Sequence, residues 1–133
     1  MVEQISSFIC RNCGTENKCK RNTTNTYCNN KCQQQYQRNA SIQKWVSGDN
    51  ISADRRTLRG YITDTVGYFC NICNIDNWND KEITLQVDHI DGDASNNRYN
   101  NVRLLCPNCH SQQPTWGARN KGNGRAARGL PLR

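Results

Sequence analysis

The sequence has few apolar side chains and no long apolar segment. Only 35% of its 133 residues are hydrophobic, 8% are aromatic, and the mean hydropathy is −0.94. No apolar run approaches the roughly 20 residues of a membrane-spanning helix, so we expect no membrane association. The N-terminal residues MVEQISSF contain neither a basic region nor a long apolar one. We therefore expect no secretory signal and a cytoplasmic location.

Cysteine, by contrast, is abundant, with nine residues. A chain this short and polar buries a small core, and such proteins usually depend on disulfides or bound metal for stability. Because we expect no export, paired CxxC motifs indicate metal ligands rather than disulfides.

The cysteines fall into two sets of four, with Cys19 left over. The first set has the spacing CxxC then CxxxC, and the second has CxxC twice: Cys10, Cys13, Cys28 and Cys32; Cys70, Cys73, Cys106 and Cys109. A CxxC turn holds two thiolates on one side of a knuckle, and two such pairs complete the tetrahedral site that structural zinc prefers. We predict one structural Zn²⁺ in each set. Cys19 could compete in the first set, but we favour an ordinary thiol.

The net charge of +7 is unevenly distributed. Residues 10–45 carry a net +6 and residues 117–133 a net +5, whereas residues 46–116 carry a net −3. Two basic ends suit a protein that binds a polyanion. For residues 117–133, a solvated and disordered tail explains the charge equally well.

The sequence pattern predicts a small α+β fold stabilised by zinc. Residues 1–47 are typical of a zinc-knuckle or treble-clef-like module that contacts DNA, with a loop over 14–26 and a helix over about 29–46. Residues 48–67 are expected to form a helical linker. Its helix runs over about 54–66, with Ser52 as N-cap, Gly67 as C-terminal stop and one face made by Leu58, Tyr61, Ile62 and Thr65.

Two strands and a helix are predicted further along the chain. Residues 83–90 alternate and are rich in β-formers, and residues 102–105 form a short second strand. Pro107 suits the first turn of a helix that continues to Gln113, where Pro114 stops it. The aromatic residues expected in the core are Trp45, Tyr61 and Trp78.

A group of titratable residues beside the second cysteine set could carry chemistry. Asp88 and His89 are adjacent on the predicted strand, so their side chains point to opposite faces. His110 directly follows the zinc ligand Cys109. Asp88 and His110 could hold a divalent metal with open positions for water and phosphate, which leaves His89 as a general base. A purely structural zinc module, or His110 as an alternative zinc ligand, would explain the same residues.

The runs DHI at 88–90, NVRLL at 101–105 and CPNCH at 106–110 together resemble the HNH nuclease motif. The resemblance covers residues 68–116, with one CxxC before the motif and one within it, as in zinc-stapled HNH nucleases. Small free-standing HNH endonucleases of tailed phages are similar, including the run CHSQxPT from Cys109 onward. The resemblance implies a ββα-metal nuclease domain that hydrolyses DNA, in the host cytoplasm if the chain is phage-encoded.

The resemblance also implies roles for single residues. His89 would be the general base that activates the attacking water. Asn101 would orient the strand that carries this base. Asn97 and Asn100 are nearby competitors for that place in the motif, but only Asn101 has the right distance before Leu105 and Cys106.

The catalytic metal implied by the resemblance would lie on Asp88 and His110. It would be Mg²⁺ or Mn²⁺, with Ni²⁺ or Zn²⁺ as alternatives. Family members often carry a further His or Lys a turn after the last motif His, where this chain has Gln112-Gln113-Pro114. That departure leaves a metal site with two protein ligands. The products would be 5′-phosphate and 3′-hydroxyl ends, from nicking or from double-strand cleavage.

Double-stranded DNA is the expected partner, bound mainly through its phosphates. The candidate contacts are Arg11, Lys18, Lys20, Arg21, Lys31, Arg38, Arg103, Arg119 and Lys121. A non-catalytic nucleic-acid-binding module and an accessory protein of a packaging or replication machine are the alternatives. Both a monomer and a homodimer are compatible with the sequence.

Overall fold

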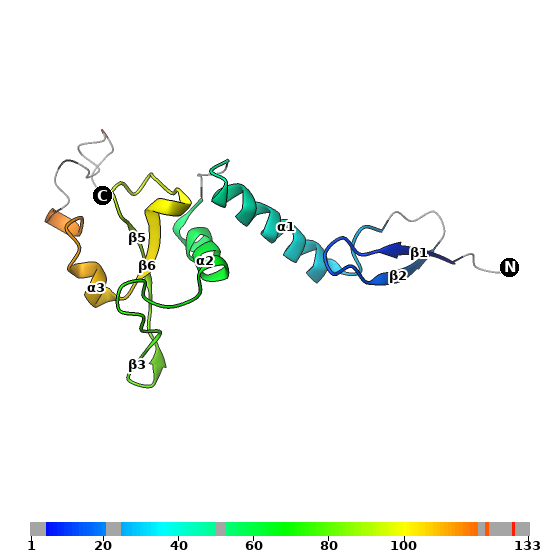
Figure 1. Ribbon diagram of the computed structural model, residues 1–133, viewed down its shortest axis with the longest axis horizontal. Helices are drawn as coiled ribbons and strands as arrows, with labels where there is room; N and C mark the ends of the chain where they lie inside the picture. Colours follow the sequence, from blue (N-terminus) through cyan, green and yellow to red (C-terminus); the bar gives the residue numbers. More distant parts are fainter. Residues whose placement is uncertain (1–4, 21–24, 50–52, 120–121, 123–128, 130–133) are drawn as a thin grey trace. The chain divides into compact units, whose positions relative to one another are not determined.

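The computed structural model describes residues 5–20, 25–49, 53–119, 122 and 129, and the fold is small α+β (Figure 1). The chain divides into two compact units, Met1–Lys44 and Trp45–Arg133. Each sheet has two strands. Within the described residues, no helix combines the length and apolar character needed to cross a membrane.

The first unit begins with a hairpin of β1 (Ile5–Ile9) and β2 (Glu16–Lys20), in which Ile5 pairs with Lys20 and Ile9 with Glu16. The expectation of a loop over 14–26 is therefore wrong for 16–20, while 21–24 lie outside the described residues. The run ENKCK lacks the alternation of apolar and polar residues that predicts a strand. In the structure, all three charged side chains of β2 are exposed. Pairing with β1, rather than burial of β2, defines this strand.

The predicted helix over 29–46 is confirmed as α1 (Asn30–Val46). It begins where the Asn29 side chain accepts a hydrogen bond from the backbone N–H of Cys32 at 2.8 Å, which satisfies one of the free amides of the first turn. The helix start thereby fixes Cys32 beside Cys28. Trp45, the last residue but one of the helix, is fully buried and belongs to the second unit.

The second unit is built on the antiparallel pair β5 (Gln86–His89) and β6 (Val102–Leu105). Two helices pack against both strands: α2 (Arg55–Thr65) and α3 (Pro107–Ser111) (Figure 1). The segment expected as a linker thus contributes a helix to the packing of this unit. Its fully buried large side chains are Trp45, Leu58, Leu85, Leu104 and Leu105.

The boundaries of α2 follow from its capping residues. Asp54, rather than the expected Ser52, is the N-cap, and its side chain accepts from the backbone N–H of Thr57 at 2.8 Å; Ser52 lies outside the described residues. Gly67 ends the helix as predicted, with φ +116° and its N–H bonded to Thr63 O at 3.0 Å. On the predicted apolar face Leu58, Tyr61 and Ile62 are buried, but Thr65 is exposed.

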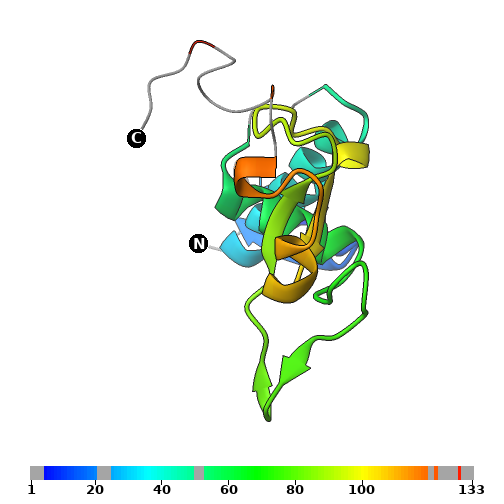
Figure 2. The ribbon, with the colours of Figure 1, turned by 90° about the vertical axis from the view of Figure 1, so that its left-hand side faces the viewer.

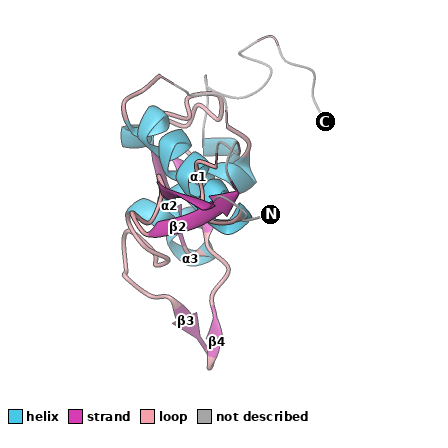
Figure 3. Ribbon diagram, turned by 90° about the vertical axis from the view of Figure 1, so that its right-hand side faces the viewer, coloured by secondary structure: helices cyan, strands magenta, loops and turns pink. Residues whose placement is uncertain are grey.

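The expected strand over 83–90 is shorter in the structure. Only 86–89 form β5, and a separate hairpin of β3 (Asn77–Trp78) and β4 (Lys81–Glu82) precedes it. Asn79 and Asp80 both have positive φ, which the tight turn requires. Figure 2 and Figure 3 show this hairpin extending away from the rest of the unit, and Trp78 is 67% exposed rather than buried as expected.

The strand over 102–105 is confirmed as β6, and Pro107 begins α3 as predicted. However, α3 ends at Ser111 instead of Gln113. The Gln113 side chain turns back to donate to Cys109 O at 2.7 Å and to accept from Arg103 at 2.9 Å. In the tail, a single 3₁₀ turn, η2 (Gly117–Arg119), is described, and most of the residues after it lie outside the described part.

Candidate active site and zinc sites

Both predicted cysteine sets come together in space. In each set, the four Sγ atoms lie within 4.8 Å of one another. Sγ atoms around a tetrahedral zinc, each at about 2.3 Å from the ion, are about 3.8 Å apart. The Sγ–Sγ distances of 3.9 Å for Cys13–Cys28 and 3.8 Å for Cys73–Cys106 fit that geometry. Both sets could therefore bind zinc.

Cys19 takes no part in the first cluster. Its Sγ lies 3.3 Å from the Ser6 hydroxyl across the β1–β2 ladder. The competing interpretation of Cys19 as a zinc ligand is not supported by this position.

The first cysteine of each set has an environment that favours its thiolate. Hydrogen bonds from the backbone, chiefly at Cys13, lower the pKa of Cys10 to about 6. Burial raises the pKa of Cys70, but backbone hydrogen bonds at Cys73 and Cys106 outweigh it and bring the pKa to about 6. By contrast, burial and the adjacent thiols raise the pKa of Cys109 to about 12. Without a metal, the first thiol of each set thus favours the charged form while others resist it. A bound dication would stabilise all four thiolates together.

Asp88 is a buried carboxylate, with 3% of the residue exposed, and it needs compensating partners. Its Oδ2 accepts from Nε of Arg103, its cross-strand neighbour, at 2.8 Å. Its Oδ1 lies 3.5 Å from Nε2 of His110. Two ligands of one metal at about 2.1 Å, at bond angles between octahedral and tetrahedral, lie about 3.0–3.4 Å apart. The pair Asp88 and His110 is thus close to the spacing of two ligands on one ion.

His110 is held with Nε2 toward Asp88. Its Nδ1 lies 2.6 Å from Gln86 Oε1, so Nδ1–H donates and the Nε2 lone pair remains for a metal. Trp116 packs edge-on against the ring, with centroids 4.4 Å apart. Burial lowers the pKa of His110, which favours the neutral form that ligates metal, and the nearby Arg55 and Arg103 charges act in the same direction against Asp88.

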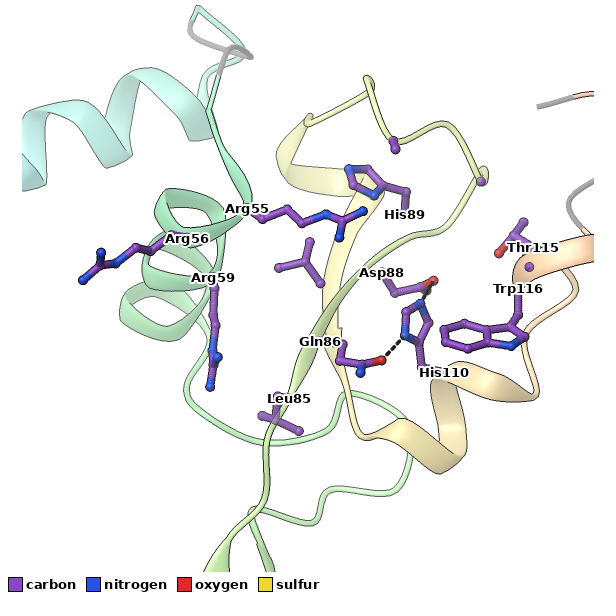
Figure 4. A pocket seen from close by; sticks show the side chains of 14 residues that line it. Arg55, Arg56, Arg59, Leu85, Gln86, Asp88, His89, His110, Thr115 and Trp116 are labelled. Atoms are coloured by element: carbon purple, nitrogen blue, oxygen red, sulfur yellow. Dashed lines mark hydrogen bonds and ion pairs between the residues drawn. The ribbon is translucent and has the colours of Figure 1, made fainter. Parts of the chain in front are cut away.

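His89 ends β5 and points to the side opposite Asp88, as strand alternation requires (Figure 4). Its Nε2 lies 2.8 Å from Oδ1 of Asn97. Asp88, His89 and His110 nevertheless line one cleft of about 580 Å³. The cleft therefore brings the expected base and both expected metal ligands to a common space.

Asn101 is buried and closes the loop that follows β5. Its Nδ2 donates to Asp91 Oδ1 at 2.9 Å and to Asn96 O at 2.8 Å, and its Oδ1 accepts from the Asp91 N–H at 3.1 Å. Its backbone carbonyl also accepts from Ile90 N–H at 2.9 Å. These bonds hold the segment directly after His89, but the asparagine that bonds the His89 ring is Asn97.

Arginines on α2 form the facing wall of the cleft: Arg55, Arg56 and Arg59. Figure 4 shows the Arg55 side chain extending from α2 toward His89. Arg59 instead lies over the Tyr68 ring and donates to its hydroxyl. The sequence interpretation missed these three residues, although the spacing of Arg55 and Arg59 by one helical turn could have identified a basic helix face.

The residues expected to contact DNA are distributed over both units. Arg11, Lys18, Lys20, Lys31, Arg38 and Arg119 are exposed, whereas Arg21 and Lys121 lie outside the described residues. Arg11 lies over the ring of Tyr36 at 5.5 Å. Arg103 differs from the others, because its guanidinium binds Asp88 and Gln113.

A comparison with curated proteins agrees with the motif. Over 53 residues, the chain is 45% identical to the H-N-H endonuclease F-TflIV of Escherichia phage T5. The match covers 40% of this chain and 23% of that protein, so the chain spans about a quarter of its relative's length. The predicted similarity to phage HNH endonucleases is thereby confirmed for this segment. No family model and no solved structure matches the chain.

Proposed function

We propose that the protein is a metal-dependent HNH endonuclease that hydrolyses phosphodiester bonds of double-stranded DNA. The observation that carries this proposal is the cleft in which the Asp88–His110 pair, at 3.5 Å, lies together with His89 and the α2 arginines. The similarity to a phage endonuclease supports the same activity. It also supports the host cytoplasm as the place of action.

Asp88 and His110 would hold one divalent metal, Mg²⁺ or Mn²⁺, in the cleft. When bound, such an ion neutralises charge on the scissile phosphate and on the departing 3′ oxygen. Arg103 keeps the Asp88 carboxylate in place, and Gln86 keeps the His110 lone pair turned toward it. Because Asp88 and His110 would supply two ligands, water and phosphate can take the other positions.

His89 would accept the proton of the attacking water. With Nε2 engaged by Asn97, the lone pair of the neutral ring lies on Nδ1. In-line attack of the water oxygen on phosphorus forms the new P–O bond of a 5′-phosphate and breaks the bond to the 3′ oxygen, which takes a proton from solvent water to become a 3′-hydroxyl. Arg55, which lines the cleft and has no bonding partner among the described residues, would pair with a DNA phosphate beside the scissile bond.

Zinc ions in the two cysteine sets would stabilise the fold rather than act in the reaction, since four thiolates leave no open position. The N-terminal unit, with Lys18, Lys20, Lys31 and Arg38 exposed, would add phosphate contacts.

Cleavage of a supercoiled plasmid tests this function directly. The protein, purified with zinc and supplied with Mg²⁺ or Mn²⁺, should convert the plasmid to nicked or linear DNA, and EDTA should stop the reaction. Sequencing the ends should give 5′-phosphates and 3′-hydroxyls. A protein that binds DNA with the expected salt dependence but leaves it intact with every divalent metal would be a zinc-stapled binding module instead.

A further inference from the structure

We propose that Asn97 is the residue that positions His89 for proton transfer, and that Trp45 and the backbone of Ala53 hold Asn97 in place. This inference rests on the proposed endonuclease function. Asn97 is distinct from Asn101, whose amide bonds to the loop residues Asp91 and Asn96. It would act through His89 without touching the DNA.

The orientation of the Asn97 amide follows from its second bond. Asn97 Nδ2 donates to the backbone carbonyl of Ala53 at 2.9 Å. A carbonyl can only accept, so Nδ2 must face Ala53 and Oδ1 must face His89. Across the 2.8 Å contact the His89 ring must therefore donate from Nε2. The neutral ring is then left with its lone pair on Nδ1, and the ring plane is fixed.

The backbone of Asn97 is anchored as well. The indole Nε1–H of Trp45 donates to the Asn97 carbonyl at 2.7 Å. Trp45 has no exposed surface, and it packs against the rings of Tyr61 and Tyr99 at centroid distances of 5.6 and 5.2 Å. A buried aromatic in such a cluster has few alternative positions, so the donor that holds Asn97 is rigid.

The two contacts that hold Asn97 against His89 come from outside the strand–loop–strand–helix segment that carries the motif. Trp45 lies in the last turn of α1, and Ala53 lies just before the Asp54 cap of α2. Asn101 secures the first part of the loop, at Asp91 and Asn96, whereas Asn97 ties the later part to α1 and α2. The position of the general base would thus depend on residues that precede the motif by a whole helix.

A double-mutant cycle on the cleavage rate tests this role. The variants are Asn97→Ala, His89→Ala and the double variant, with Asn100→Ala as control, because Asn100 is an exposed asparagine of the same loop. Single-turnover rates are measured with saturating DNA and metal. We expect Asn97→Ala to slow cleavage by about 10- to 100-fold, the range for a modest misplacement of a catalytic group. In the His89→Ala background the same change should have an effect below about 2-fold, because there is no base left to position.

Trp45→Phe provides a second, milder variant if Asn97→Ala folds poorly. It keeps the aromatic packing but removes the N–H that holds the Asn97 carbonyl, so we expect a smaller loss of rate with unchanged DNA affinity. Zinc content and the unfolding midpoint of each variant report on folding. Equal rate losses from Asn97→Ala with and without His89 would indicate a merely structural residue and would overturn the proposal.

A spectroscopic measurement separates this inference from the activity itself. The chain has two histidines, so ¹⁵N-histidine labelling gives two ring systems. The Nε2–H proton of His89 should be visible and protected from exchange in the wild type and in Asn100→Ala, and lost in Asn97→Ala. A wild-type protein that cleaves no DNA would overturn the proposed function. A protein that cleaves DNA, but whose Asn97→Ala variant keeps the His89 signal, would overturn only the role of Asn97.

Discussion

Asp88 and Arg103 face each other across the β5–β6 ladder, and Arg103 Nε donates to Asp88 Oδ2 at 2.8 Å. This bond occupies one oxygen of the buried carboxylate and leaves the other directed at His110. Arg103, which the sequence suggested as a DNA contact, therefore supports Asp88, the proposed metal ligand. If Arg103 contacts DNA, its replacement should lower DNA affinity; if it supports Asp88, its replacement should lower metal affinity.

Arg103→Ala should weaken binding of the catalytic metal rather than binding of DNA. Loss of a residue that orients a ligand typically lowers metal affinity by about 10- to 100-fold. Mn²⁺ titrations measure this change in metal affinity, with the cleavage rate and the heat of binding as the two readouts. Arg98→Ala is the matched control, because Arg98 is exposed and lies outside the cleft. A loss of metal-free DNA affinity specific to Arg103→Ala would restore the phosphate-contact role.

His89→Ala and His110→Ala should fail in different ways. His89→Ala removes the base but no metal ligand, so DNA and metal should still bind while cleavage slows by about 10²- to 10⁴-fold. His110→Ala would remove one of the two proposed protein ligands, and raised Mn²⁺ should partly restore its rate. Neither change should release zinc. If His110→Ala lost zinc and unfolded, His110 would belong to the structural site.

The fold should contain two zinc ions per chain, countable by native mass spectrometry. Structural zinc contributes on the order of 10 kcal/mol per site, a large amount for so small a core. Cys106→Ser, at a fully buried ligand, should therefore unfold the second unit, whereas Cys19→Ser should leave the zinc count at two. A single zinc, or a disulfide between Cys10 and Cys13, would contradict the model of two sites.

Arg55→Ala should weaken DNA binding through the loss of one phosphate contact at the cleft. The slope of log affinity against log salt should then fall by about 0.9. Fluorescence anisotropy with a DNA duplex at several salt concentrations gives this slope. Arg98→Ala changes the net charge equally without touching the cleft, so an equal fall in both variants would show that only total charge matters.

Truncation after Trp116 should lower DNA affinity by a similar factor for all sequences and also lower the salt slope. The removed segment carries five basic and no acidic residues. Trp116 is retained in this variant because its ring packs against His110. A changed cleavage-site preference at constant salt slope would instead mean that the tail reads base sequence.

The sequence was sufficient for features that depend on ligand type and spacing. Both cysteine clusters form as the CxxC spacing predicts, and α1, α2 and β6 lie within a residue or two of their expected bounds. Asp88 and His110 could be paired from the sequence because both lie within regular elements, β5 and α3, beside the second cysteine set. Metal-ligand chemistry and helix periodicity are local properties, so a single sequence exposes them.

Features that depend on pairing between distant segments could not be predicted. The polar strand β2 forms through its pairing with β1, and the residues ENKCK carry no pattern that would predict this pairing. Likewise, Asn97, which bonds His89, is itself bonded to Trp45 and Ala53, and both lie more than forty residues before Asn97 in the chain. The sequence alone does not show which asparagine of this loop bonds His89, because that depends on tertiary contacts.

The β3–β4 hairpin offers a site for protein engineering. The backbone N–H of Ile83 donates to the carbonyl of Asp76 at 2.8 Å, so the two ends of the hairpin meet. Its strand residues and Trp78 are exposed, and it projects from the rest of the unit (Figure 2). In the sequence it lies between the two cysteine pairs of the second set. A peptide tag or a small domain with neighbouring termini could replace residues 77–82 without altering any cysteine or cleft residue. The same position would tolerate insertions and deletions during evolution, so natural length variation should concentrate there.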